Sequence, residues 1–453
     1  MIRIRNGVRW GAALALLACG SAWAAPGTLA NSPLFLTTSA EPNILFLLDD
    51  SGSMDWEVMT KDYAHGGIFL TNQPDGTDVA DAGDIQQRIA ADSGSGDCTQ
   101  GYQDGGYIYG VEFGSNSTKD DAHDCYTADD RAWRFRDYQF NSLYFNPNKD
   151  YEPWAGTNVA DVPFSEITKY TLTSAPDDPY NPTEYIDLTL DTSNWKGEAT
   201  RDDTIGKGFY FYTWTNADGD GHFDNGEQTE YRIATLTDTD ASQWGKTADE
   251  VKKNFANWFI YYRSRDYVAK AAYGHVIADA TNVRIGLVTT SEDGDTAISH
   301  MNDDPTTGAK RDLLHALYSI KPSGDTPLHK MLYACGSYLA CDSGGTLFGG
   351  ACPEADVGAQ CQQNFTVALS DGYYTDSDFN DASSYPDIAN NDGDDNTAWD
   401  SGTNGPYGDA HDNTLADIAM HFYETDLRGN IANEVPTSPG VDLNHAQHMV
   451  TYT

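Results

Sequence analysis

The stretch NILFLLDDSGSM, residues 43–54, joins an apolar run to a group of oxygen-bearing side chains. Asp49, Ser51 and Ser53 alternate along the chain, and alternate side chains of an extended or tightly turned backbone point the same way. Gly52 allows the turn between the two serines. One carboxylate and two hydroxyls form a hard partial shell, which suits Mg²⁺ or Mn²⁺ better than Zn²⁺ or Cu²⁺. The pattern therefore predicts part of a cation site directly after a buried strand.

Two later segments carry side chains that could complete this shell. Thr326 stands in GDTP just before a helical pattern, and Asp371 ends the strand-like run FTVALSDG. Each motif alone has an ordinary explanation, because such residues often form turns or cap helices. In this order along alternating strands and helices, the three segments predict one shared site.

The segment NADGDGHFDNGE, residues 216–227, resembles the twelve-residue calcium loop of an EF-hand. Glycine stands at the sixth position, where such loops turn sharply, and an acid stands at the twelfth. Asparagine at the first position carries one negative charge less than the usual aspartate. The preceding residues 207–214 are strand-like, so flanking helices are not expected, and a solvated acidic hairpin is the alternative. The predicted calcium ligands are Asn216, Asp218, Asp220, His222 through its carbonyl, Asp224 and Glu227.

Strand-like and helix-like segments alternate around the first site. The apolar runs 43–49, 282–290 and 365–372 predict buried strands, and residues 448–453 predict the start of a fourth. Helical patterns cover 247–280, 309–320, the residues after Pro327, and 414–427. This order predicts an α/β fold, with a doubly wound, mostly parallel sheet and helices on both faces. Ligands of such sheets bind beyond the carboxyl ends of the strands, where the three segments should meet.

The helical pattern 247–280 carries the clearest local signals. Thr247 and Glu250 have the spacing of a capping box. Apolar residues recur near one helical face, which is expected to be buried: Phe255, Trp258, Phe259, Tyr262, Ala269, Tyr273 and Val276.

The charge balance excludes some classes of partner. The chain has 27 Lys and Arg against 69 Asp and Glu, a formal net charge of −42. Such a surface repels nucleic acid and anionic lipid and attracts cations or basic partners. Acid-rich surfaces also keep secreted proteins soluble, so only acids in ordered spacings support a metal site.

The first 24 residues have the pattern of an export signal, with a basic start, a short apolar stretch and small residues, Ala22 and Ala24, at the A-x-A positions. A lipoprotein cleavage box ending at Cys19 is the second reading. We expect no membrane-spanning segment.

Six cysteines remain beyond the signal, an even number that favours disulfides over zinc in an exported chain. They allow 15 pairings. Proximity favours a bridge between Cys98 and Cys125 and two bridges among Cys335, Cys341, Cys352 and Cys361.

The motifs D-x-S-G-S, G-x-T-P and S-D-G, in this order, resemble those of the von Willebrand factor A domain and its metal-ion-dependent adhesion site. The resemblance implies that Asp49, Ser51, Ser53, Thr326 and Asp371 hold Mg²⁺ or Mn²⁺. It also implies that a carboxylate of a bound partner completes the shell. The departure is a long inserted region, about 200 residues, between the first strand and its helix.

Four further stretches, 140–154, 258–272, 413–429 and 445–453, resemble the PilC/PilY-type family of type IV pilus biogenesis factors and tip adhesins. The resemblance implies minor pilins and the pilus machinery as partners, a host or surface ligand, and export to the periplasm, outer surface and pilus tip. It also implies a C-terminal β-propeller in the family, and we expect this sequence to end before that part.

The resemblance also defines the expected organisation. A signal at 1–24 and a lead-in at 25–42 precede the first strand and metal loop at 43–54. An inserted subdomain with the calcium loop, β-rich and supported by disulfides, follows at 55–245, and the rest of the A domain occupies 246–453, ending partway through it.

Catalytic motifs are absent from the sequence, which has no G-x-S-x-G, H-E-x-x-H or Walker loop. His329, close to Thr326, is not expected to bind the metal, because hard oxygen sites rarely include imidazole. We therefore expect an adhesin rather than an enzyme. The alternative is a structural, calcium-stabilised surface domain without metal-dependent ligand binding.

Overall fold

The computed structural model describes residues 40–57, 59, 133, 136–169, 172–183, 185–189, 209–219, 226–292, 294–342, 347–353, 358–372, 374–375, 388–392, 411–438 and 442–453. All of them belong to one compact unit, Ser39–Thr453. The predicted export signal, Cys98 and Cys125 lie outside the described residues.

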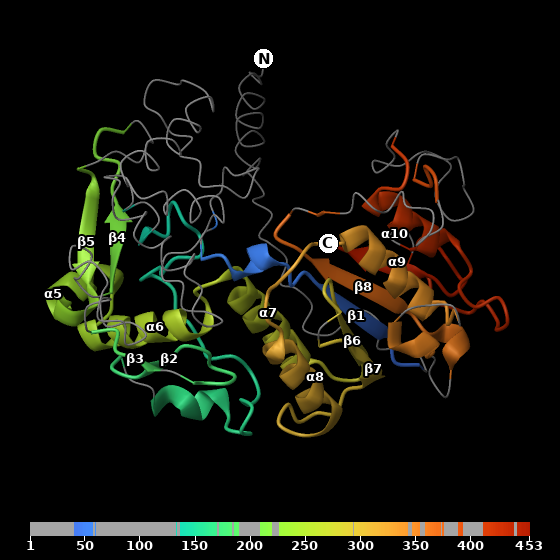
Figure 1. Ribbon diagram of the computed structural model, residues 1–453, viewed down its shortest axis with the longest axis horizontal. Coiled ribbons are helices and arrows are strands. Elements are labelled where there is room, and N and C mark those ends of the chain that lie inside the picture. Colours follow the sequence, from blue (N-terminus) through green and yellow to red (C-terminus); the bar gives the residue numbers. More distant parts are fainter. Residues whose placement is uncertain are drawn as a thin grey trace, which may run out of the picture. The chain divides into compact units, whose positions relative to one another are not determined.

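A five-stranded sheet organises the part of the chain that carries the motifs (Figure 1). Its order is β7-β6-β1-β8-β9. β1 pairs in parallel with both β6 and β8, β9 pairs in parallel with β8, and β7 is antiparallel to β6. The bounds are β1 Asn43–Leu48, β6 Arg284–Thr289, β7 Thr296–His300, β8 Asn364–Leu369 and β9 Met449–Tyr452. The mostly parallel sheet is confirmed, whereas the edge strand β7 was not expected.

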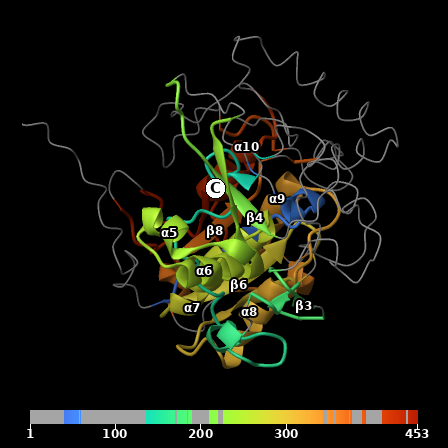
Figure 2. The ribbon, with the colours of Figure 1, turned by 90° about the vertical axis from the view of Figure 1, so that its left-hand side faces the viewer.

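Helices cover both faces of this sheet (Figures 1 and 2). Leu45 and Leu47 of β1 pack into a core with α9 (Leu328–Leu339) and α10 (Leu415–Glu424). Phe46 and Leu48 point to the other face, whose core includes α7 (Arg265–Asp279) and α8 (Gly308–Ser319). Because successive side chains of a strand alternate between faces, an unbroken apolar run suits a strand buried on both sides.

The pattern 247–280 forms two helices rather than one: α6 (Ala248–Tyr261), with the predicted capping box, and α7. Tyr262 leaves the helical conformation at φ −142°. The buried Arg263 then donates from Nη1 to the carbonyl of Phe259, 2.7 Å away, at the end of α6. Within α7, Ala269 and Tyr273 are buried as predicted, whereas Val276 is 56% exposed and the prediction for it is wrong.

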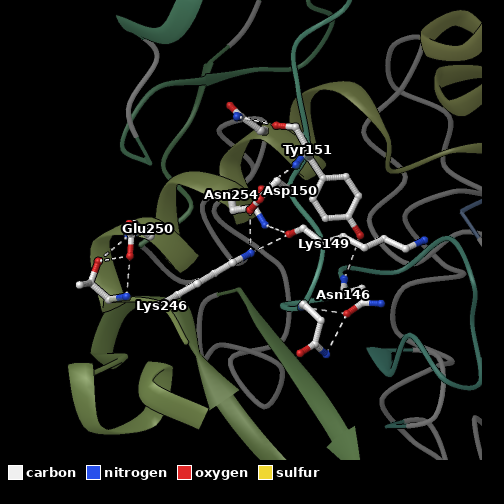
Figure 3. Close-up of polar contacts among 10 residues, drawn as sticks. Asn146, Lys149, Asp150, Tyr151, Lys246, Glu250 and Asn254 are labelled. Atoms are coloured by element: carbon white, nitrogen blue, oxygen red, sulfur yellow. Dashed lines mark hydrogen bonds and ion pairs between the residues drawn. The ribbon is translucent and has the colours of Figure 1, made fainter. Parts of the chain in front are cut away.

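The region before α6 packs closely against that helix (Figure 3). The Lys246 ammonium lies 2.7 Å from a carboxylate oxygen of Asp150 and donates to the carbonyl of Lys149 at 2.9 Å. The amide N–H of Tyr151 donates to Oδ1 of Asn254 at 2.8 Å. Aromatic rings extend this contact, and one buried cluster runs from Phe46 to the rings of the inserted region.

The other described elements are short. Two antiparallel pairs, β2 with β3 and β4 with β5, belong to the inserted region. Their bounds, with the remaining helices, are β2 Ala175–Pro176, β3 Tyr185–Ile186, β4 Tyr210–Trp214, β5 Gln228–Arg232, α5 Asp238–Ala241, and the 3-10 helices η1 Gly52–Asp55, η4 Phe164–Lys169, η6 Ile233–Thr235, η7 Ser242–Trp244, η8 Leu347–Gly350 and η9 Ala359–Cys361.

The described cysteines form one disulfide, between Cys341 and Cys352. Cys335 is a free, fully buried thiol on α9, and Cys361 is free and half-buried. The expectation of two bridges among these four residues is therefore wrong, because Cys335 belongs to the core under the sheet. Of the helices in the described ranges, none has both the length and the apolar composition needed to cross a membrane.

Candidate metal centre

The strand register brings the predicted ligands to one rim of the sheet. Leu48 at the end of β1 pairs with Leu369 of β8 and Thr289 of β6. The next residue, Asp49, therefore lies opposite Ser370, and its amide donates to the carbonyl of Leu369 at 2.9 Å. The carboxyl ends of parallel strands meet here, as expected for a ligand site in an α/β sheet.

The turn after β1 folds its side chains around the Asp49 carboxylate. Oδ1 of Asp49 accepts a hydrogen bond from the amide of Ser51 at 2.9 Å, and Oδ2 accepts one from the hydroxyl of Ser370 at 2.7 Å. The hydroxyl oxygens of Ser51 and Ser53 lie 3.1 Å apart. Asp49 and Ser51 are almost fully buried. One carboxylate and two serine hydroxyls are thus gathered in one turn, as the spacing predicts.

The loop that carries Thr326 reaches the same rim. The carbonyl of Gly324 accepts from the amide of Gly52 at 3.2 Å, between the two serines. The amide of Ser323 donates to the carbonyl of Asp50 at 2.7 Å. Thr326 itself is buried, and its backbone exchanges two hydrogen bonds with Thr375, just beyond β8. The backbone therefore joins this loop to both of the other segments.

Asp371 follows Ser370 and completes the convergence, but it already has a partner. Its Oδ2 forms an ion pair with the guanidinium of Arg265, the first residue of α7. Both side chains are largely buried, at 3% and 12% exposed. The guanidinium also lies over the ring of Trp56, 4.8 Å from its centroid.

The rim concentrates negative charge away from water. Burial raises the pKa of Asp49 above its usual value, and the nearby Asp371 carboxylate raises it further, against hydrogen bonds from Ser51 and Ser370 that lower it. A dication placed between the two carboxylates would relieve both effects. The neighbouring Asp50 is kept apart from this site, because its carboxylate is bonded to Thr290 and Ser291.

The donor set fits a hard cation. Among the described residues, no three His, Cys, Asp or Glu side chains gather as a metal cluster. The rim instead combines two carboxylates with hydroxyls, a set of oxygens that suits Mg²⁺ or Mn²⁺ with water or a partner filling the remaining positions.

The calcium-like segment forms the loop of the β4–β5 hairpin, without flanking helices. Oδ1 of Asn216 accepts from the amide of Gly219 at 2.8 Å. Glu227 folds back over the start of the loop: Oε1 accepts from the amide of Ala217 at 2.6 Å, and Oε2 accepts from the indole N–H of Trp214 at 2.8 Å. The twelfth position of the segment therefore contacts the backbone of the second. Asp218 is exposed, and Asp220, His222 and Asp224 lie outside the described residues.

Comparison with curated proteins gives relatives along most of the chain. The type IV pilus biogenesis factor PilY1 of Pseudomonas aeruginosa strain UCBPP-PA14 is 25% identical over 439 residues, 94% of this chain and 31% of that protein. The chain is a distant homologue of PilY1. The PilY1 proteins of strains PAK and PAO1 are 22% and 23% identical, each over 97% of this chain and 34% of the relative. The chain thus spans about a third of the length of these PilY1 relatives. No family model and no solved structure matches the chain.

Sequence reasoning missed two side chains at the rim of this PilY1 homologue. Ser370 belongs to the S-D-G motif, and its place beside the strand end could have suggested its bond to Asp49. Arg265 gave no such signal, since it lies about 100 residues before Asp371 in a helical pattern. Its role appears only when α7 and β8 are placed side by side.

Proposed function

We propose that this chain is the metal-dependent ligand-binding part of a type IV pilus biogenesis factor and tip adhesin, built on a von Willebrand factor A domain. Asp49, Ser51, Ser53, Thr326 and Asp371 hold Mg²⁺ or Mn²⁺. The bound cation supplies a positive charge that accepts a carboxylate from a host or surface ligand. The observation that supports this proposal is the convergence of three distant segments on the turn that begins with the buried Asp49.

The remaining assignments rest on the relatives and on the hairpin. The relatives are named as pilus biogenesis factors, so we place the chain outside the cytoplasm, with the pilus machinery and its minor pilins as partners. Calcium in the loop between β4 and β5 stabilises the inserted region, with Asn216, Asp218 and Glu227 among its ligands. We assign no catalytic turnover to either site.

The test combines a binding measurement with a cell assay. Purified chain is titrated with Mn²⁺, and free Mn²⁺ is followed by electron paramagnetic resonance. Cells that carry Asp49→Asn in the full-length gene are assayed for piliation and for surface adhesion with and without added Mg²⁺. We expect the variant to lose Mn²⁺ binding and Mg²⁺-dependent adhesion, whereas Glu227→Gln keeps both. Unchanged adhesion of a variant that no longer binds Mn²⁺ would contradict the adhesive role.

A second candidate is a structural surface domain without metal-dependent ligand binding. The ion pair between Arg265 and Asp371 favours it, since this pair partly neutralises the rim without any cation. That function predicts that Asp49→Asn leaves adhesion intact, while Glu227→Gln lowers thermal stability in calcium.

A further inference from the structure

Arg265 contacts Asp371, one of the predicted ligands of the candidate metal centre. Its guanidinium is paired with Asp371, and the Asp371 charge is felt at Asp49. The rim thus holds two carboxylates and one guanidinium, all of them largely buried. We propose that Arg265 is a built-in counterion that competes with the metal for Asp371 and sets the metal affinity of the rim. This inference rests on the metal site of the proposed function.

The position of Arg265 is fixed from several directions. Its amide donates to the carbonyl of Trp56 at 3.0 Å, and its guanidinium lies over the ring of the same residue. Trp56 in turn donates its amide to the carbonyl of Ser53, a candidate ligand, at 3.1 Å. The guanidinium is therefore held beside the metal turn by the residue that ends that turn. A surface arginine on a flexible stem would not have this constraint.

The charges predict what happens when a metal binds. A dication that binds Asp371 moves the guanidinium of Arg265 away from it, because the two positive charges repel each other at close range. Arginine remains protonated at any physiological pH, so it cannot lose its charge to make room. Arg265 therefore lowers the metal affinity while protecting the metal-free rim from carboxylate repulsion.

The residues just before Arg265 connect the start of α7 to the inserted region. Two residues before Arg265, the buried Arg263 donates to the carbonyl of Asp177 at 2.7 Å and lies 3.9 Å from the carboxylate of Glu57. A shift of Arg265 on metal binding would thus act on the start of α7, next to residues that contact the inserted segment.

The experiment measures Mn²⁺ affinity by electron paramagnetic resonance in the wild type, Arg265→Gln, Arg265→Lys and Arg311→Gln. Arg311 lies on α8 and forms ion pairs with Asp161 and with its neighbour Asp312. Its substitution therefore removes the same charge from a different ion pair. We expect Arg265→Gln to bind Mn²⁺ about tenfold more tightly, as close repulsion between a unit charge and a dication predicts. Arg265→Lys and Arg311→Gln should bind like the wild type.

Thermal unfolding gives a readout without metal. In EDTA, Arg265→Gln should melt at a lower temperature than the wild type, because the two carboxylates lose their counterion, and Mn²⁺ should raise its melting temperature more than that of the wild type. If the wild type binds Mn²⁺ and Arg265→Gln binds it equally or more weakly, the counterion role is overturned while the metal site stands. Absence of binding in both proteins would overturn the metal site and this inference with it.

A measurement on the native contact covers the case in which Arg265→Gln does not fold. Mg²⁺ is titrated into the wild type and into Trp56→Phe while tryptophan fluorescence is followed. Displacement of the guanidinium from Asp371 should change the surroundings of the Trp56 ring, so the wild type should show a saturable change that Trp56→Phe lacks. Identical titration curves in the two proteins would contradict the proposal.

Discussion

The rim of the sheet and the β4–β5 hairpin both gather oxygen-bearing side chains, but they hold them in opposite ways. At the rim, Asp49 is fully buried and accepts a hydrogen bond from Ser370, 321 residues away in the chain. In the hairpin, Glu227 accepts from Trp214, 13 residues away, and from the nearby amide of Ala217. The rim is assembled by the closed fold, whereas the hairpin loop is assembled by its own sequence.

This difference determines what a cation has to do in each place. At the rim the carboxylates are set before the metal arrives, and the cost of the arrangement is repulsion and lost hydration, which a dication offsets. In the hairpin the Glu227 carboxylate already has N–H partners, so calcium must replace or share those bonds. We expect the metal to move the Arg265 side chain away from Asp371 at the rim and to change the local backbone conformation in the hairpin.

The largest expected effect concerns Asp137, a buried carboxylate next to Tyr212 of the hairpin. Burial raises its pKa to about 7, although the amides of Gln139 and Trp214 donate to it. The folded protein therefore binds a proton that the unfolded chain releases, and stability falls by about 1.4 kcal/mol per pH unit between about pH 4 and about pH 7. Asp137→Asn should remove this slope.

The measurement is urea unfolding of the wild type and Asp137→Asn at about pH 5 and about pH 8. The wild type should lose stability relative to the variant as pH rises. A difference between the two proteins that is the same at both pH values would show that Asp137 is ionised throughout and that the hairpin tolerates a buried charge.

The next effect tests whether stability and metal binding are separable. The disulfide between Cys341 and Cys352 lies after the C-terminal end of α9, whereas Thr326 precedes its N-terminal end. The two cysteines are 11 residues apart in the sequence. Replacing both by serine should lower the free energy of unfolding by about 3 kcal/mol, because the unfolded chain loses this cross-link. Mn²⁺ affinity should not change in this variant. Cys361→Ser, which removes a free thiol, is the control and should leave stability unchanged.

A smaller effect is expected from the metal itself. At Mg²⁺ about 100 times above its Kd, binding to the folded state stabilises it by about 2.7 kcal/mol. Asp49→Asn should lose this increment, yet without metal it should be as stable as the wild type, since the substitution removes a buried charge facing Asp371. Differential scanning calorimetry with and without Mg²⁺ checks this. A full Mg²⁺ shift in the variant would contradict the assignment of Asp49.

The smallest effect should appear in the hairpin. Asn216→Asp restores the charge expected at the first position of the loop and should tighten calcium binding about fivefold, or about 1 kcal/mol. Isothermal titration calorimetry compares it with Asn181→Asp, which adds the same charge at an exposed position outside the hairpin. Equal affinities in both variants would mean that the loop does not use its first position as a ligand.

Local and periodic signals predicted much of the fold. The unbroken apolar run of β1, the Thr247–Glu250 capping box and the positions of β6, β8 and β9 along the chain follow from neighbouring residues, and the structure contains them. The turn of Asp49, Ser51 and Ser53 was predictable for the same reason, since its spacing is local.

The features that could not be predicted from the sequence depend on contacts between elements of the folded chain. The break between α6 and α7 follows from the burial of Arg263 against Phe259 and Tyr267, which no periodicity encodes. The pairing of Arg265 with Asp371 and the choice of Cys352 as the partner of Cys341 both depend on elements that are distant in sequence or on the packing of a loop. Such contacts are fixed only by the assembled fold.

The central place of β1 has a consequence for how the chain reaches its folded form. Its two neighbours follow it by about 240 and about 320 residues, so about 240 further residues must be synthesised before the first partner strand exists. Pairings this remote close slowly and leave an apolar strand with open edges in the meantime. If the chain is exported as an unfolded polypeptide, it would need protection from aggregation until β8 has followed β1 across the membrane.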